Sequence, residues 1–250
     1  LHIQDGMKAG GILFVNGDND MLSNVHAKAG CHTVRYGLGA DNDYRAEDLS
    51  YPDGFPSFTM VHGEVRVPVK LTVMGEHNVM NALAALAVAD AYGVPLADAA
   101  EKLLEFGGFK NRQQIYHKNG YTIVDDTYNA SPDSMKASID VLCDLDCKGK
   151  KYAVLADMNE LGDDSVSYHR QIGEYLRDKK IDEVIVVGEK ALDIKKALDE
   201  CDTKYAKTFS FMDNEEVALY LMAIMKPEDI VLLKGSNSMK LNEIVKILTN

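Results

Sequence analysis

The alternation of short apolar runs with longer amphipathic stretches after Gly107-Gly108 is the feature that most constrains the fold of this chain. The apolar runs are YTIVDD at 121–126, KYAVLAD at 151–157, DEVIVVG at 182–188 and DIVLLKG at 229–235. Helical patterns lie between them, at 134–145, 168–179, 191–200 and 214–225. Strands that alternate with helices predict a parallel, doubly wound α/β sheet.

The part of the chain before Gly107 has a different organisation. Strand-like runs at 12–16, 32–37, 57–63 and 65–74 are separated by turns rich in Gly, Asn, Asp and Pro. Two helices are predicted next, at 78–93 and 96–106, with Val94-Pro95 as the break between them. We therefore expect a domain boundary within 107–112 and two domains, 1–108 and 109–250.

The composition excludes several classes of protein. A net charge of −12 disfavours a nucleic-acid groove, because phosphate backbones are bound by an excess of Lys and Arg. No apolar run reaches the ~18 residues of a membrane span, and the N-terminus lacks the basic and apolar blocks of a signal peptide, so we expect a cytoplasmic protein. The four cysteines are sparse, and no Cys/His pair joins Cys143 and Cys147 to complete a zinc site.

Polar segments follow the predicted strands where a ligand would bind. In open α/β sheets, ligands collect outside the carboxyl ends of the strands. The segments at these ends are 125-DDTYNASPDS-134, 156-ADMNELGDDS-165, 187-VGEKA-191 and 234-KGSNSMK-240. The alternative is that they form loops and helix caps, for which Asp133, Ser134 and Ser165 are suited. Their occurrence together at one edge favours a site.

Four further features allow both a functional and a structural interpretation. Asn78 and Asn81 place two carboxamides on one helix face, where they could contact a base edge or cap the helix. Arg112 lies at the predicted domain junction, where it could clamp a phosphate or remain solvated. Lys234 ends an apolar run and could hold phosphate or carboxylate, or simply form part of a turn. His169 could be a ligand or base, or could cap the start of a helix or be exposed to solvent there.

The order of the polar segments resembles the Mur ligase family. The resemblance rests on GEHNVMNALAALA, the NR of KNRQQ, DDTYNASPDSM, VLADMNELGDDSVSYH and VLLKGSNSM, and extends over nearly the whole chain. Within the family, DDxYNAxPDSM and MxELG are typical of the branch that adds D-alanyl-D-alanine to UDP-N-acetylmuramoyl-tripeptide. The resemblance implies an α/β protein in which the back half of a central ATPase domain precedes a Rossmann-like, doubly wound C-terminal domain.

The activity implied by the resemblance is ATP-dependent amide-bond formation in peptidoglycan precursor synthesis, with ATP and Mg²⁺ as cofactors and small molecules as partners. The reaction passes through an acyl phosphate that the amine of D-alanyl-D-alanine attacks. No G-x-x-x-x-G-K-[ST] phosphate loop occurs in these residues. We therefore expect a fragment that lacks the N-terminal domain and the phosphate loop, and that does not hydrolyse ATP by itself.

The resemblance also implies roles on the nucleotide side. It places Asn78 and Asn81 against the adenine with His77 beside them, Arg112 on the ATP phosphates and Asp126 on the ribose hydroxyls. The NGDN turn, with Asn16 and Asp18, would support the nucleotide pocket. No residue of this chain is assigned as a metal ligand.

On the acceptor side, the resemblance implies a cleft between the domains that is lined by Tyr128, Asn129, Lys234 and Ser236. Arg112, Asp126 and Lys234 are the residues that we expect to matter for catalysis. Two positions depart from the family pattern: Asn237 stands where Arg is common, and Ser131 where Asn is frequent. Because Asn237 lacks the positive charge of that arginine, the resemblance predicts the type of reaction more firmly than the identity of the acceptor. Glu160 and His169 match the MxELG motif and the following His position of the family, where a structural role is the alternative to a functional one.

Other functions remain open at this point. A sibling Mur ligase or a folylpolyglutamate synthase would share the reaction and differ in the acceptor. A nucleotide- or amino-acid-binding module without catalysis is also compatible, since a fold does not determine a function. An oxidoreductase is disfavoured because no G-x-G-x-x-G follows any predicted strand.

Overall fold

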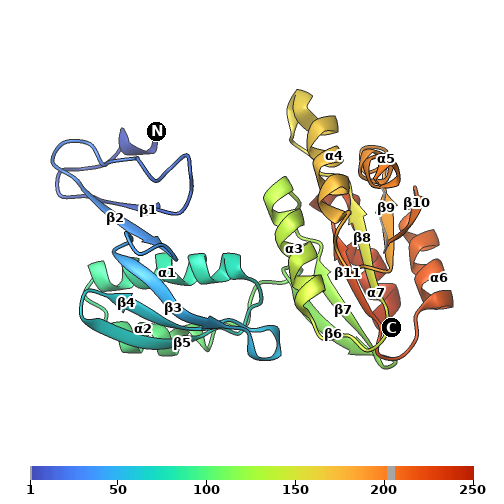
Figure 1. Ribbon diagram of the computed structural model, residues 1–250, viewed down its shortest axis with the longest axis horizontal. Coiled ribbons are helices and arrows are strands. Elements are labelled where there is room, and N and C mark those ends of the chain that lie inside the picture. The colour runs from blue at the N-terminus through green and yellow to red at the C-terminus, as the bar shows by residue number, and fades with distance from the viewer. Residues whose placement is uncertain (1, 202–205) are drawn as a thin grey trace. The chain divides into compact units, whose positions relative to one another are not determined.

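The structure is a computed structural model that describes residues 2–201 and 206–250, and it divides into two compact units. The first unit comprises Leu1–Gly107 and the second Gly108–Asn250. Each unit has its own sheet and its own core (Figure 1).

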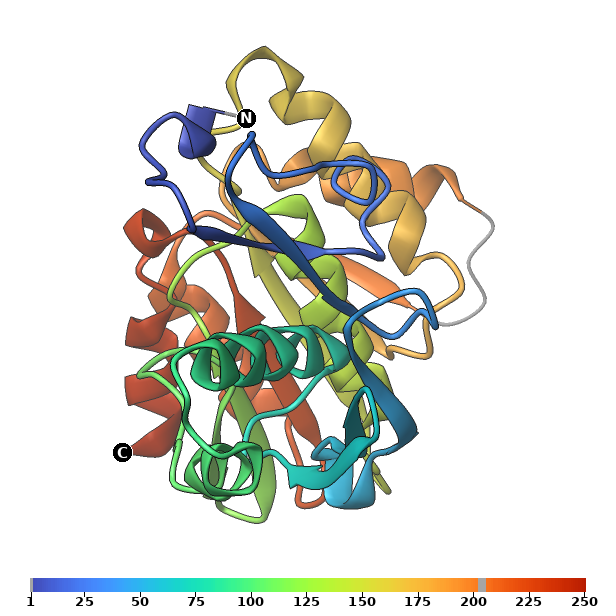
Figure 2. The same cartoon turned by 90° about the vertical axis from the view of Figure 1, so that its left-hand side faces the viewer.

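The first unit contains a five-stranded mixed sheet with the strand order β1-β2-β3-β4-β5. Its elements are β1 (Ile12–Asn16), β2 (His32–Gly37), β3 (Tyr44–Ser50), β4 (Ser57–His62), β5 (Val65–Lys70), α1 (Glu76–Ala91) and α2 (Leu96–Leu103). The pairs β1–β2 and β2–β3 are parallel, whereas β3–β4 and β4–β5 are antiparallel. Helices α1 and α2 pack beside each other against this sheet (Figure 2).

The core of the first unit follows from two periodicities. In β5, Val67 and Val69 are buried while their neighbours are exposed, as expected for a strand with one face on the core. Helix α1 buries Val79, Leu83 and Leu86, which lie on one side of a helix with 3.6 residues per turn. These residues pack together, so the sheet and α1 form one apolar core.

The predicted elements of the first unit are largely present, with shifted ends. Strand β5 ends at Lys70 rather than at residue 74, and α1 covers 76–91 instead of 78–93. Helix α2 ends at Leu103, three residues before the predicted end. Strand β3 was not predicted, because the charged residues of YRAEDLS obscure the inward-facing Tyr44 and Ala46.

The second unit is a six-stranded sheet with the order β10-β9-β8-β11-β7-β6. Its strands are β6 (Gln114–Lys118), β7 (Tyr121–Asp126), β8 (Lys151–Ala156), β9 (Glu183–Val187), β10 (Lys207–Phe211) and β11 (Ile230–Lys234). Its helices are α3 (Pro132–Asp144), α4 (Ser165–Leu176), α5 (Leu192–Glu200), α6 (Asn214–Ile224) and α7 (Asn242–Thr249). Helices α6 and α7 share a core with one face of this sheet, whereas α3, α4 and α5 pack against one another elsewhere on it.

The doubly wound prediction is confirmed for this unit, with one departure. Strands β10, β9, β8, β11 and β7 are parallel to their neighbours, but β6 pairs antiparallel with β7 as a hairpin at the edge. Three elements, β6, β10 and α7, were not predicted from the sequence. The two missed strands are the edge strands, which are less apolar than the central ones.

The strand order determines which loops meet. Strand β11 is the last strand in sequence, but it is inserted between β8 and β7. In this register Lys234 lies opposite Asp126 on one side and Leu155 on the other. Because β7, β8, β9 and β11 are parallel, the four polar segments of the sequence analysis lie at the same edge of the sheet.

Candidate active site

A buried ion pair between Lys234 and Asp126 lies at this edge of the second unit. The Nζ of Lys234 is 2.7 Å from Oδ2 of Asp126 and donates to the carbonyl of Asn129 at 3.0 Å. The Lys234 residue is only 2% exposed. Burial lowers the pKa of its ammonium below the ordinary value, although the Asp126 carboxylate acts in the opposite direction. A charge held in this way is costly unless it is paired, and the Asp126 carboxylate supplies that pairing.

The Asp126 carboxylate is anchored from a second side. The Oγ of Ser138 on α3 lies 2.5 Å from Oδ2 of Asp126, the same oxygen that accepts from Lys234. A hydroxyl of a bound ribose would therefore have to use Oδ1. The side chain of Asp126 is 11% exposed, so its contact with a ribose stays a prediction that requires access from the strand-end edge.

Arg112 lies close to this pair and is held by an aromatic ring. Its guanidinium carbon is 4.2 Å from the centre of the Tyr128 ring, which is cation–π geometry. The loop that carries Arg112 is bound to the strand end, since the Tyr128 N–H donates to the carbonyl of Asn111 at 2.9 Å. Asn111 and Gln113 both have positive φ values, 59° and 50°. Non-glycine residues seldom adopt this conformation, and such strain clusters at functional sites.

Five sequence-predicted residues of the second unit therefore form one cluster, comprising Arg112, Asp126, Tyr128, Asn129 and Lys234. Ser236 lies two residues after Lys234, in the loop that follows β11. It is 4% exposed, its Oγ accepts from the N–H of Asn159 at 2.8 Å, and its own N–H donates to the carbonyl of Asp157. Its hydroxyl therefore ties the loops after β8 and β11 together.

Two polar residues beside Ser236 were not singled out from the sequence. The Nδ2 of Asn159 donates to Oγ of Ser238 at 2.8 Å, and Nζ of Lys190 donates to Oδ1 of Asn159 at 2.6 Å. Both residues lie in segments that the sequence analysis placed at the ligand-binding edge. The signal that could have found them is therefore their position directly after β8 and β9.

In the first unit, Asp18 holds a loop in place. Its carboxylate accepts from the N–H groups of Leu38 and Gly39 and from Nδ2 of Asn42, and Oδ1 of Asn16 accepts from the N–H of Asp18. All these partners are protein groups. This arrangement is compatible with a supporting role for the NGDN turn, in which Asp18 shapes the loop after β2.

The two asparagines of α1 are bonded to each other. The Nδ2 of Asn81 donates to Oδ1 of Asn78 at 3.0 Å, and Nδ2 of Asn78 donates to the Met74 carbonyl at 2.7 Å and lies 3.2 Å from Nε2 of His77. The N-cap of α1 is Gly75, with φ of 89°, and no side chain caps this end. The capping alternative therefore does not describe this pair, and contact with an adenine stays a prediction.

The capping residue of α3 is Ser131. Its Oγ accepts from the N–H of Ser134, and Oγ of Ser134 accepts from the N–H of Ser131, which is a capping box. Pro132 is the first helical residue, where its missing N–H costs nothing. Of the three predicted cap formers, Ser134 acts only as the partner of Ser131. Asp133 and Ser165 lie inside the first turns of α3 and α4.

His169 has an internal structural position. It is fully buried, its Nε2 accepts from the N–H of Met158 at 2.9 Å, and its Nδ1 lies 2.7 Å from the carbonyl of Ser165. Both ring nitrogens are thus used to hold the loop after β8 against α4. Glu160 in that loop is exposed and has φ of 65°.

The buried Asp125 leads to a prediction about pH. Burial raises the pKa of its carboxyl, and Asp126 acts in the same direction, whereas the hydrogen bonds from Thr127 oppose them. Ionisation therefore costs stability, and this cost appears as pH rises from the ordinary value of 3.8 through the raised folded pKa. Asp125→Asn keeps an oxygen for Thr127, so its stability relative to the parent protein is expected to increase between pH 4 and 7. Urea midpoints across this range measure the difference.

Asp178→Asn is the matched control for this measurement. The Arg177 guanidinium lowers the pKa of the exposed Asp178, so the pH dependence of this variant is expected to have the opposite sign and to be smaller. If the stability of Asp125→Asn relative to the parent protein stays constant or falls as pH rises, the pKa of Asp125 is not raised in the folded protein.

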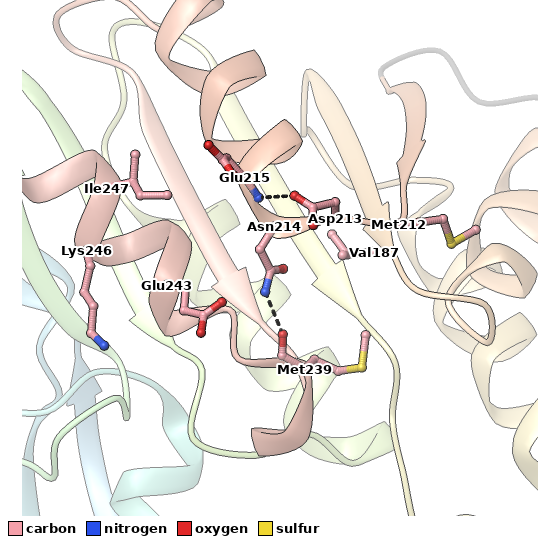
Figure 3. A pocket seen from close by; sticks show the side chains of 9 residues that line it. All are labelled: Val187, Met212, Asp213, Asn214, Glu215, Met239, Glu243, Lys246 and Ile247. Carbon is pink, nitrogen blue, oxygen red and sulfur yellow. Dashed lines mark hydrogen bonds between the residues drawn. The ribbon is translucent and has the colours of Figure 1, made fainter.

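A hollow of about 500 Å³ lies in the second unit beside the ends of β9 and β10 and the first turns of α6 and α7 (Figure 3). It is lined by Val187, Met212, Asp213, Asn214, Glu215, Met239, Glu243, Lys246 and Ile247. Asn214 donates to the carbonyl of Met239 across it at 2.9 Å. None of the sequence-predicted site residues lines this hollow.

Residues 2–201 and 206–250 contain neither a candidate metal-binding cluster nor a candidate membrane-spanning helix. Within these residues, no three or more His, Cys, Asp and Glu side chains are grouped so that they could hold a metal ion. No helix there is long and apolar enough to cross a membrane. The four cysteines are half-buried.

Known proteins resemble this chain along nearly its whole length. Residues 111–237 match the family model described as the Mur ligase, glutamate ligase domain, and residues 1–89 match the Mur ligase middle domain. The UDP-N-acetylmuramoyl-tripeptide--D-alanyl-D-alanine ligase of Bacillus subtilis is 35% identical over 99% of this chain and 53% of its own length.

Solved structures agree with this relationship. MurF from Acinetobacter baumannii matches with a TM-score of 0.87 and 27% identity, over 98% of this chain and 53% of that one. The MurF ligase of Thermotoga maritima in complex with ADP matches with a TM-score of 0.80 and 27% identity, over 96% and 53%. The chain thus spans about half the length of the curated relatives it matches.

Proposed function

Because the chain belongs to the Mur ligase family, we propose that this protein is an ATP-dependent ligase that joins D-alanyl-D-alanine to UDP-N-acetylmuramoyl-tripeptide. The observation that carries the proposal is the 35% identity, over 99% of the chain, to a ligase named for this reaction. The structural likeness to two MurF proteins supports it.

The chemistry of this reaction explains the need for a cation-rich strand edge. A carboxylate is a poor electrophile, so the tripeptide carboxylate is activated as an acyl phosphate, for which ATP supplies the phosphoryl group. The amine of D-alanyl-D-alanine then attacks the acyl carbon, and phosphate leaves. The protein mainly positions the reactants and neutralises charge.

The cluster around Lys234 fits such a task. Arg112 is exposed and oriented by its stacking on Tyr128, so its guanidinium can contact phosphate oxygens. Lys234 is bound to Asp126, and its positive charge lies at the end of β11 within a rigid network. Asp126 would meet the ribose hydroxyls, and Tyr128, Asn129 and Ser236 would contact the acceptor.

The first unit would contribute to binding of the nucleotide base. The carboxamides of Asn78 and Asn81 offer both donors and acceptors, which suits the edge of an adenine. We propose that Mg²⁺ accompanies the ATP, with the nucleotide's phosphate oxygens and water among its ligands.

The proposed reaction belongs to peptidoglycan precursor synthesis, and thus to cell wall biogenesis, cell shape and cell division. Its nucleotide substrates are small polar molecules of the cytoplasm, so we propose a cytoplasmic location. Neither a nucleic acid nor a membrane span is part of the proposal.

Phosphate release by the full-length gene product tests this function. The assay contains ATP, Mg²⁺ and UDP-N-acetylmuramoyl-tripeptide, and compares D-alanyl-D-alanine with single amino acids and glutamate. Release that depends on D-alanyl-D-alanine is the expected result. Release with another acceptor would assign the protein to a sibling branch, and no release with any acceptor would favour the binding module.

A further inference from the structure

The proposed acceptor carries a negative charge that the reaction does not consume. The amine of D-alanyl-D-alanine attacks, but its C-terminal carboxylate stays ionised and must be bound. A carboxylate that leaves water needs a cation or several hydrogen-bond donors. If the proposed function holds, a side chain near the acceptor must supply this cation or these donors.

Lys190 is a cation at the strand-end edge whose charge is not cancelled. Lys234 is buried and paired with Asp126, so its charge is already balanced. Lys190 is exposed, and its Nζ donates to the neutral amide oxygen of Asn159. It has no carboxylate partner within residues 2–201 and 206–250. An ammonium has three donors, so Lys190 can bind an anion while it keeps this hydrogen bond.

Asn159 determines where this ammonium lies. The Nδ2 of Asn159 is used by Ser238 and its backbone N–H by Ser236, so Oδ1 is the atom turned toward Lys190. The backbone of the Lys190 loop is also fixed, because the N–H of Ala191 donates to Oδ1 of Asp157 at 2.7 Å. The position of Lys190 is therefore built by the loops after β8, β9 and β11 together.

The spacing along the edge fits a dipeptide. The ammonium of Lys190 lies at the end of β8, where it is hydrogen-bonded to Asn159. Neighbouring strands are about 4.8 Å apart, so the end of β11 lies one strand spacing from β8 and the end of β7 two spacings. An extended dipeptide spans roughly 7 Å. With its carboxylate at Lys190, its amine would lie between one and two spacings away, near the ends of β11 and β7. These strand ends carry Lys234 and Asp126.

We propose that Lys190 is a specificity-determining residue that binds the C-terminal carboxylate of the incoming D-alanyl-D-alanine, with Asn159 as its positioning residue. In this arrangement Lys190 supplies the positive charge that Asn237, a neutral residue on the neighbouring loop, cannot supply.

A pair of acceptors tests the contact directly. The full-length enzyme is assayed with D-alanyl-D-alanine and with its C-terminal amide, which has the same shape without the charge. Lys190→Met is expected to raise KM for the dipeptide about 10- to 100-fold, as for loss of one charge-assisted hydrogen bond. Its kcat is expected to change by less than about threefold, and its KM for the amide to match that of the parent enzyme.

Two further variants separate this role from a structural one. Asn159→Asp leaves Lys190 in place but brings a carboxylate to its ammonium, and is expected to raise KM for the dipeptide selectively as well. Lys196→Met removes an exposed cation that is paired with Asp193, and is expected to leave both KM values unchanged.

The outcomes distinguish this inference from the proposed function. If Lys190→Met leaves KM for the dipeptide unchanged, or raises KM equally for the dipeptide and the amide, Lys190 does not bind the carboxylate. Lys240 is another lysine at this edge, in the segment 234–240 after β11. If Lys240→Met shows the selective effect and Lys190→Met does not, Lys190 likewise does not bind the carboxylate. If the parent enzyme does not use D-alanyl-D-alanine at all, the proposed function fails first.

Discussion

Lys234→Met is expected to lower the free energy of unfolding of the second unit by about 3–5 kcal/mol. The substitution removes the ammonium that neutralises Asp126 and leaves its carboxylate, on a side chain that is 11% exposed, without a cation. It also removes the hydrogen bond to the carbonyl of Asn129. Breaking a buried pair from one side is costly because the desolvated charge remains.

Hydrogen exchange of the β7 and β11 peptides measures this effect within the full-length protein. A separate readout for the second unit is needed because a protein of several domains does not unfold in one step. The double variant Asp126→Leu with Lys234→Met removes both charges and is expected to recover much of the loss. Arg177→Met breaks only the exposed pair with Asp178 and is expected to cause no measurable change.

Two results would refute this account of the pair. One is that hydrogen exchange in the β7 and β11 peptides of Lys234→Met is as slow as in the parent protein. The other is a double variant that is no more stable than Lys234→Met, since the cost would then come from lost packing and not from the unpaired charge of Asp126.

Arg112→Met is expected to lower kcat/KM of the proposed ligase reaction about 10²- to 10³-fold. This magnitude is typical when one donor to a developing charge is removed. Arg112 is exposed and contacts the face of Tyr128, so its loss should leave the buried network around Lys234 intact. The expected signature is a loss of activity while hydrogen exchange in β7 and β11 is unchanged.

Lys110→Met is the matched control, because Lys110 is an exposed cation in the same loop. Its kcat/KM is expected to stay within about threefold of the parent enzyme. Tyr128→Leu removes the ring that orients Arg112 and is expected to give an intermediate loss. If Arg112→Met retains kcat/KM within threefold of the parent value, Arg112 does not contact the phosphates.

Much of the second unit could be predicted from local pattern. Strand β7 occupies the predicted residues, and β8, β9 and β11 differ from their predictions only at the ends. Their apolar runs are long and continuous, as expected for strands that are buried on both faces. The edge strands β6 and β10 carry both polar and apolar side chains in a short segment, so the apolar pattern of a strand is weak and neither was predicted.

The site was predictable in part for the same reason. Polar residues directly after buried strands are a local signal, and it identified Asp126 and Lys234. It did not identify Asn159 or Lys190, because their importance depends on the contact between them. Nor did it identify Ser131 as the cap of α3, since the helix begins at Pro132, earlier than predicted.

The sequence by itself determined the strands β7, β8, β9 and β11, the helices α3, α4, α5 and α6 between them, and the polar character of the ends of these strands. Only the tertiary structure decided which strand ends are neighbours. Lys234 and Asp126 are 108 positions apart and meet because β11 is inserted between β8 and β7. The central strands are all apolar, so any of them could pair with any other as far as local pattern is concerned. Their order follows from how the connecting helices pack on the two faces of the sheet, and this depends on the whole unit.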